Sequence, residues 1–211
     1  MSTLHPIARG VITSMVALLT LIAVVPSARA QIWTELADAG SLPATADHTV
    51  GTGALSLING TLASNTDVDM YCIRVTNPAT FGAFLSCLAL NENDIWLFDA
   101  GGIGVGRDRG CQGGQTRVGA PLVTVTGVYY LAVSGNDASA QNAGSNLWQL
   151  GVPVTGQVAP NGPAAALPVN GWAGGTANPS SYSIQLIGAS FCDSAVPTRT
   201  RSWSQIKTIY R

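Results

Sequence analysis

The chain has 211 residues, which suffices for one domain with a sizeable hydrophobic core but not for two full domains. Charged residues make up only 10%, against an average of about 25%, while 24 glycines and 11 prolines accompany a hydrophobic fraction of 46%. These values exclude disorder of the highly charged type, and a net charge of −1 gives no indication of nucleic-acid binding.

The N-terminal segment, residues 1–30, has the organisation of a secretory signal peptide. Arg9 precedes a mostly apolar run over residues 11–25, and Ala28 and Ala30 supply a cleavage pattern before Gln31. A membrane anchor is the alternative, but about 15 apolar residues fall short of the roughly 20 that span a bilayer. We therefore predict export to the periplasm, the cell surface or the medium, with no membrane span.

Strand patterns recur at short intervals through the rest of the chain, separated by turns rich in Asn, Asp and Gly. Residues 69–76 alternate, with Tyr71 and Ile73 on one face and Cys72 and Arg74 on the other, which predicts a half-buried antiparallel strand. About eight such strands predict an all-β fold, an antiparallel β-sandwich or jelly roll. The other candidate strands are residues 54–62, 80–90, 95–99, 103–107, 122–126, 128–134 and 182–188.

A long stretch rich in Gly, Ala, Asn and Pro, residues 135–181, interrupts this rhythm. Trp148 and Trp172 are its large aromatic residues. Long loops inside a compact domain are functional or flexible. One interpretation is a cover that the two tryptophans pack against one end of the sandwich, and the other is a loop that presents them to a ligand.

The cysteines all follow the predicted signal peptide, and their number, four, is even. In an exported protein this predicts two disulfides, for which three pairings are open. We favour a local bond between Cys87 and Cys111 and a long-range bond between Cys72 and Cys192.

The residues offer little catalytic chemistry. His48 is the only histidine after residue 30, and no G-x-S-x-G motif accompanies it. Calcium binding is a better candidate, because Asp67 and Asp69 have D-x-D spacing and Asp94 begins a strand that could lie near them. The alternative is that these side chains only form turns.

Four motifs in order carry a resemblance to a known family: residues 67–79, 94–102, 127–135 and 181–186. Together they resemble the bacterial pre-peptidase C-terminal domain, in the variant found in secreted proteins of planctomycetes and similar bacteria. The resemblance covers roughly residues 50–192, and we assign the domain to residues 31–192. It implies a non-catalytic jelly-roll sandwich that assists secretion, adheres or binds matrix polymers, and that in some members binds calcium. Residues 106–111 depart from the family's Asn-Asp-Asp turn, and no catalytic domain accompanies the module.

The C-terminal residues 193–211 differ in charge from the body. Residues 31–192 hold ten acidic and four basic residues, a net −6, whereas the tail carries +3. A linker is followed by a short helical pattern that needs a partner surface, because about ten residues do not form a stable helix alone. The segment either docks on the acidic body or is a sorting signal, whose residues would be Trp203, Ile206, Lys207, Tyr210 and Arg211.

Taken together, these patterns predict a secreted, monomeric, non-catalytic binding module. Its partner would be an extracellular polymer, a polysaccharide, a protein or another cell-surface component, and calcium is the one cofactor to consider. A purely structural envelope component, in which Trp148 and Trp172 are buried, and a small secreted hydrolase are the alternatives.

Overall fold

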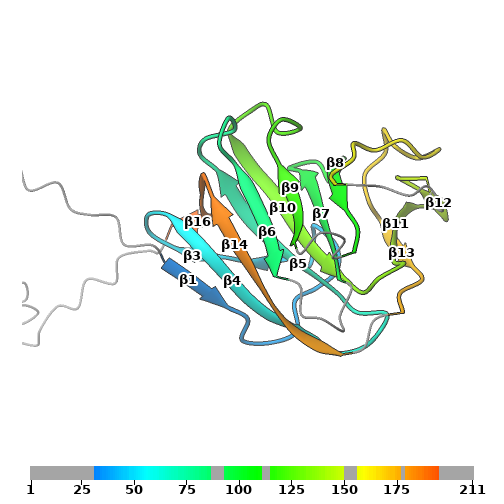
Figure 1. The fold of residues 1–211 in the computed structure, drawn as a ribbon, viewed down its shortest axis with the longest axis horizontal. Helices are drawn as coiled ribbons and strands as arrows, with labels where there is room; N and C mark the ends of the chain where they lie inside the picture. The colour runs from blue at the N-terminus through cyan, green and yellow to red at the C-terminus, as the bar shows by residue number, and fades with distance from the viewer. Residues whose placement is uncertain (1–30, 87–92, 111–114, 150–155, 177–178, 195–211) are drawn as a thin grey trace, which may run out of the picture.

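The computed structural model describes residues 31–86, 93–110, 115–149, 156–176 and 179–194. Within these ranges the chain forms strands and turns without a helix, so none of these residues belongs to a helix that could cross a membrane. Two large sheets face each other, and a smaller sheet lies beside one end of the second (Figure 1). The prediction of an all-β sandwich is confirmed.

The first large sheet has five strands in the order β1-β4-β14-β6-β9. Neighbours are antiparallel except for β1 and β4, which are parallel. The central strand β14 shows a regular alternation of buried and exposed residues, as expected where one face of a strand meets the core and the other meets water. The strands are β1 (Gln31–Thr34), β4 (Leu55–Leu62), β14 (Ser180–Ile187), β6 (Gly82–Ser86) and β9 (Gln115–Gly119).

The second large sheet has six strands in the order β15-β5-β10-β7-β8, with β2 also paired to β5. Strands β5 and β10 pair over eight residues each, from Val68 opposite Ser134 to Val75 opposite Gly127. This pairing is the longest in the sheet and forms its centre. The strands are β15 (Ala189–Phe191), β5 (Val68–Val75), β10 (Gly127–Ser134), β7 (Asp94–Asp99), β8 (Gly104–Asp108) and β2 (Asp47–His48).

Two minor sheets complete the fold. The first has the order β12-β11-β13, built from β11 (Ser139–Asn142), β12 (Ser145–Asn146) and β13 (Gly171–Ala173). In the second, β3 (Val50–Gly51) pairs in parallel with β16 (Asp193–Ser194). Part of the predicted loop over residues 135–181 is therefore a small sheet, and the chain continues past Cys192 as a strand.

Most predicted strands occur within one or two residues of their expected bounds. The predicted strand 122–126 is wrong: the edge strand β9 ends at Gly119, a turn closed by the Leu122 amide donating to the Gly119 carbonyl follows it, and residues 123–126 form no strand. Pattern reading missed β9 because its inward residues include the polar Thr116, which is fully buried. Of the predicted strand 80–90, residues 87–90 lie outside the described ranges.

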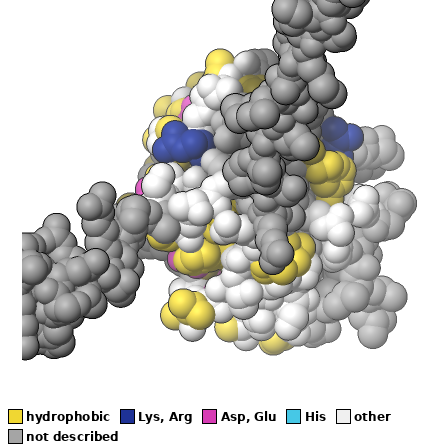
Figure 2. Space-filling model, turned by 90° about the vertical axis from the view of Figure 1, so that its left-hand side faces the viewer, with side chains coloured by type: hydrophobic (Ala, Val, Ile, Leu, Met, Phe, Trp, Pro, Cys, Tyr) yellow, Lys and Arg dark blue, Asp and Glu magenta, His cyan; other side chains and the backbone are white. Residues whose placement is uncertain are grey.

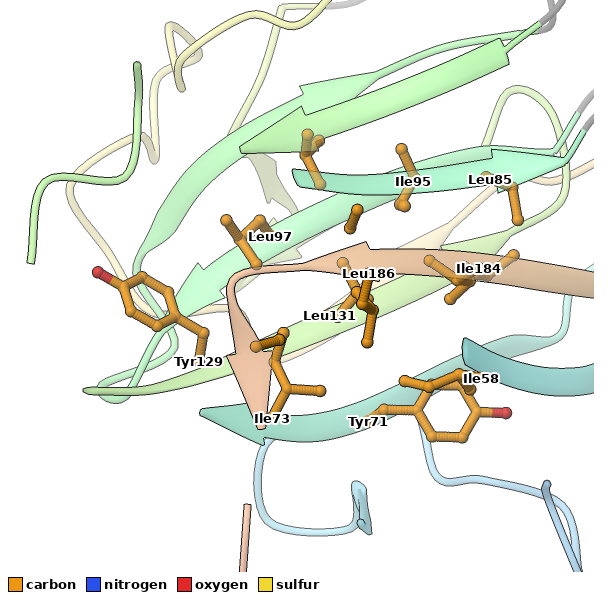
Figure 3. Packing of buried hydrophobic residues seen from close by; sticks show 14 of the residues in the cluster. Ile58, Tyr71, Ile73, Leu85, Ile95, Leu97, Tyr129, Leu131, Ile184 and Leu186 are labelled. Carbon is orange, nitrogen blue, oxygen red and sulfur yellow. The ribbon is translucent and has the colours of Figure 1, made fainter. Parts of the chain in front are cut away.

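The main core lies between the two large sheets. Figure 3 shows Leu186 of β14 beside Leu131 of β10, and Ile184 farther along β14 near Leu85 of β6. These aliphatic side chains are almost completely buried, and burial of each contributes roughly 1.5–3 kcal/mol to folding.

A second core covers the opposite face of the six-stranded sheet. Here Val68 and Met70 of β5 pack with Trp96 of β7 beneath the segment that carries Trp148. Consequently β5 is buried on both faces, and Arg74 is its one exposed residue. The prediction of a half-buried strand is wrong, because the sequence pattern of β5 does not reveal the second layer.

A disulfide between Cys72 and Cys192 joins β5 to the residue before β16, as predicted. The two cysteines are 120 residues apart in sequence, so the bond closes a long loop that contains most of the two large sheets. Three other predictions concern residues outside the described ranges. They are the bond between Cys87 and Cys111, the signal peptide, and the sorting tail with Trp203, Ile206, Lys207, Tyr210 and Arg211.

We expect the double substitution of Cys72 and Cys192 by alanine to lower the free energy of unfolding by about 2–5 kcal/mol, because the bond restricts the unfolded chain over a long loop. Urea unfolding followed by tryptophan fluorescence measures this loss. A loss below about 1 kcal/mol would contradict the structural role of the bond.

Candidate functional site

The outer face of the five-stranded sheet carries two neighbouring hollows. The larger, with a volume of about 300 Å³, is lined by Thr34, Glu35, Asn59, Gly60, Thr61, Ser181, Tyr182 and Ser183. The smaller, of about 170 Å³, shares Ser181, Tyr182 and Ser183 and adds Ser86. We call this region the hydroxyl face, because most of its side chains end in a hydroxyl or an amide group.

The alternation of buried and exposed residues along β14 places hydroxyl groups on the hydroxyl face. Tyr182 and Ile184 point into the core, so Ser181 and Ser183 between and beside them must point outward. Ser183 donates a hydrogen bond of 2.7 Å to the Asn59 side-chain oxygen on β4. Polar cross-strand contacts of this kind hold the exposed groups in a fixed row across the sheet.

An aromatic ring lies farther along the same sheet. Phe84 of β6 is partly exposed, and the Arg117 guanidinium of β9 lies 5.4 Å from the centre of its ring. A cation placed over a ring in this way is attracted by the electrons of the ring face. The outer surface of the sheet thus combines hydroxyl and amide groups with one aromatic ring.

A chain of buried hydroxyl groups lies directly beneath the larger hollow. The Tyr182 hydroxyl donates to Asp69 Oδ2 at 2.6 Å and lies 2.6 Å from the Tyr71 hydroxyl. Since Tyr182 gives its one hydroxyl proton to Asp69, it accepts a hydrogen bond from Tyr71. Gly60 closes over both tyrosines, and a side chain at this position would collide with the two hydroxyl groups.

We expect Gly60→Ala to lower the free energy of unfolding by about 1–3 kcal/mol, because the added methyl group has no space above Tyr71 and Tyr182. The matched control is Gly171→Ala in β13, where an added Cβ meets no atom within 4 Å. Thermal unfolding compares the two variants, and equal stability would contradict close packing at Gly60.

Three carboxylates meet beside the larger hollow, and we call them the carboxylate cluster: Glu35, Asp38 and Asp69. One oxygen of each lies within 4.8 Å of an oxygen of the others. Glu35 accepts hydrogen bonds of 2.8 Å from the amides of Ala39 and Thr61, which attaches its segment to β4. Burial raises the pKa of Asp69 to about 8 and also raises the pKa of Glu35.

The predicted calcium ligands Asp67, Asp69 and Asp94 do not come together as a set. Asp69 lies opposite Val133, which lies opposite Ile95, so these residues share the inner face of the sheet. Asp94 is one residue before Ile95 and therefore lies on the other face. This part of the prediction is wrong because strand register, which the sequence does not show, separates the two aspartates.

Asp67 and Asp94 have partners of their own. The Asp67 side chain accepts a hydrogen bond from the Ala63 amide and closes a turn. Asp94 lies 3.4 Å from the Arg109 guanidinium and accepts from the Gly110 amide at 2.9 Å. An arginine therefore already supplies positive charge at Asp94.

Burial raises the pKa of Asp94 to about 7, although the Arg109 guanidinium acts in the opposite direction. The folded protein then holds a proton at Asp94 between about pH 4 and 7 that the unfolded chain releases, so stability falls as the pH rises through this interval. We expect Asp94→Asn to make this dependence less steep in urea unfolding, with the remaining slope coming from other buried carboxyl groups such as Asp69. Asp137→Asn is the control, because Asp137 also contacts Arg109 but is exposed, and it should leave the slope unchanged.

The two tryptophans of the long segment pack on the protein itself. Trp148 is 1% exposed, and its ring meets Trp96 edge to face, with the ring centres 5.3 Å apart. Trp172 is half-buried against the same ring and donates to the Ser41 carbonyl. Trp148 cannot stack on a ligand in this structure, so the expectation of a ligand platform at Trp148 is corrected in favour of a packed cover.

His48 has a partner that the sequence did not indicate. Its Nδ1 lies 2.8 Å from Asp193 Oδ2, and both side chains are about half exposed. The sulfurs of Cys72 and Cys192 lie within 4.8 Å of a ring nitrogen of His48, and they are joined in the disulfide. Among the described residues, no serine, threonine or free thiol is hydrogen-bonded to this histidine.

Sequence reasoning missed the residues that build these two regions. It recognised Asp69 but not Glu35 or Asp38, which precede it by more than thirty residues. Their only sequence signal is the acidic pair at spacing three before the first predicted strand. The alternation of β14 could have identified the exposed serines, but not the neighbouring strand that completes the hollow.

Comparison with known proteins adds no assignment. No protein-family model matches the chain, and no curated protein matches it. The resemblance to the pre-peptidase C-terminal domain therefore stays a prediction.

Proposed function

We propose that this chain is a secreted, non-catalytic module that binds an uncharged polysaccharide through the hydroxyl face. The observation that carries the proposal is that both hollows lie side by side on one sheet face and share Ser181, Tyr182 and Ser183. An extended polymer could lie across both and use the same serines and the neighbouring side chains of β4.

The chemistry of the lining favours an uncharged ligand. Hydroxyl and amide groups can donate and accept hydrogen bonds, as the hydroxyl groups of a sugar do. Glu35 is the one charged residue of the lining, and both of its carboxylate oxygens already accept hydrogen bonds from backbone amides. Figure 2 shows hydrophobic side chains on one side of the molecule as separate small groups rather than one patch, an arrangement that does not favour a large apolar partner there.

Two features support a non-catalytic role. Glycosidases place two carboxyl groups about 5 to 9.5 Å apart across an open cleft. Asp69 is fully buried and bonded to Tyr182, so a sugar cannot lie between it and Glu35. The pair of His48 and Asp193 lacks a nucleophile among the described residues, as noted above.

Export is supported by the bond between Cys72 and Cys192, because disulfides persist in oxidising compartments. The proposal does not require calcium or an aromatic platform at Trp148.

Affinity electrophoresis tests this function. The protein runs in native gels that contain dextran, mannan, xyloglucan or laminarin, and we expect at least one of them to retard it. Ser181→Arg should weaken the retardation at least about tenfold, because the long cation fills both hollows. Ser145→Arg is the matched control, an exposed serine on β12 away from the hydroxyl face, and it should run like the parent.

Two outcomes would contradict the proposal. Retardation that survives Ser181→Arg would place the binding surface elsewhere on the molecule. A chain that no polysaccharide retards would favour the structural envelope component, in which the face binds no polymer.

A further inference from the structure

The carboxylate cluster concentrates negative charge without a balancing cation. Glu35 and Asp38 come from the segment after β1, and Asp69 comes from β5. Among the described residues, no lysine, arginine or histidine forms an ion pair with any of the three. Three carboxylates at this separation repel one another unless a cation or protons neutralise them.

Asp69 adds a second and independent indication of a ligand. The residue is 0% exposed, and its Oδ1 atom is buried without a hydrogen-bond partner. Its other oxygen, Oδ2, already accepts from the Tyr182 hydroxyl. Leaving a buried carboxylate oxygen unpaired is costly, so such atoms usually have a partner or a metal ion.

The segment that carries the other two carboxylates is held in place. The Met70 amide donates to the Gly40 carbonyl, and Glu35 accepts from the Ala39 and Thr61 amides. Asp38 is exposed, which leaves one side of the cluster open to solvent and to an entering ion. The arrangement therefore combines fixed ligands with an entry path.

We propose that Glu35, Asp38 and Asp69 bind one Ca²⁺ ion. All three donors are carboxylates, the hard oxygen ligands that this ion prefers. One oxygen from each of the three lies within 4.8 Å of the others, close enough for all three to contact a single ion. Mg²⁺ requires near-ideal octahedral geometry and loses its water reluctantly, whereas Ca²⁺ accepts irregular sets of oxygen ligands, so we expect the site to prefer Ca²⁺.

The ion would also rigidify the larger hollow, because Glu35 lines that hollow and bonds to β4 through the Thr61 amide. This site does not depend on the proposed function. Calcium binding can be present in a chain that binds no polysaccharide, and the measurements below contain no polysaccharide.

Thermal unfolding and isothermal titration calorimetry test the site. The protein is exported and purified with its disulfide intact, treated with EDTA, dialysed and titrated with CaCl₂ at pH 7.5. We expect one ion per chain and a rise in Tm of about 5–10 °C at a hundredfold excess over Kd. MgCl₂ at the same concentration should give a clearly smaller rise.

The variants Asp69→Asn and Asp38→Asn should each abolish most of the calcium-dependent shift. Asp38 is exposed, so its variant is informative even if Asp69→Asn does not fold. Asp99→Asn is the matched control, because Asp99 accepts hydrogen bonds in a turn outside the cluster and an asparagine retains that acceptor. Its shift should equal that of the parent.

Three results would overturn the proposal. A Tm that CaCl₂ does not change would show that protons, not a metal ion, neutralise the cluster. An undiminished shift in both Asp38→Asn and Asp69→Asn would place the ion elsewhere, and an equal response to MgCl₂ would exclude a calcium-selective site.

Discussion

The double burial of β5 is the constraint on which the rest of the structure depends. Its inner face carries Tyr71 and Ile73 into the core between the large sheets, and its outer face carries Met70 beneath the packed tryptophans. Cys72 ties the same strand to the residue before β16. A change of one residue in register would exchange the two faces and place Asp69 under the tryptophans, so the carboxylate cluster and the buried hydroxyl groups depend on this pairing.

Asp69 shows how a polar group is accommodated inside such a core. Tyr182 reaches across from the opposite sheet to donate to it, Tyr71 donates to Tyr182, and Gly60 leaves room for both rings. This chain of hydrogen bonds links the two sheets at the end where the larger hollow opens. The remaining unpaired oxygen of Asp69 is the feature that distinguishes the cluster from an ordinary surface group of acids.

The two proposals meet at Glu35. Its carboxylate belongs to the cluster, lines the hollow and fixes the segment after β1 to β4. A cation held there would order one wall of the surface assigned to the polysaccharide, while the serines of β14 would supply the contacts to the sugar. Trp148 and Trp172, the candidate ligand-binding residues of the sequence, instead stabilise the fold, because they pack on Trp96 of β7 and cover the second core.

The sequence by itself determined the fold class, most strand positions and the expectation of disulfides, but it left the pairing of Cys72 with Cys192 as one of three alternatives. Those features follow from local alternation, turn residues and cysteine number, which act over a few residues or on simple counts. Only the tertiary structure decided which residues share a site. Asp94 lies on the opposite face of the sheet from Asp69, because the strand pairing places its neighbour Ile95, not Asp94, in line with Asp69. Glu35 lies close to Asp69 because β1 pairs in parallel with β4 and the chain then returns to β5. The proximity of these side chains depends on contacts between segments that are distant in sequence, so no local sequence pattern predicts it.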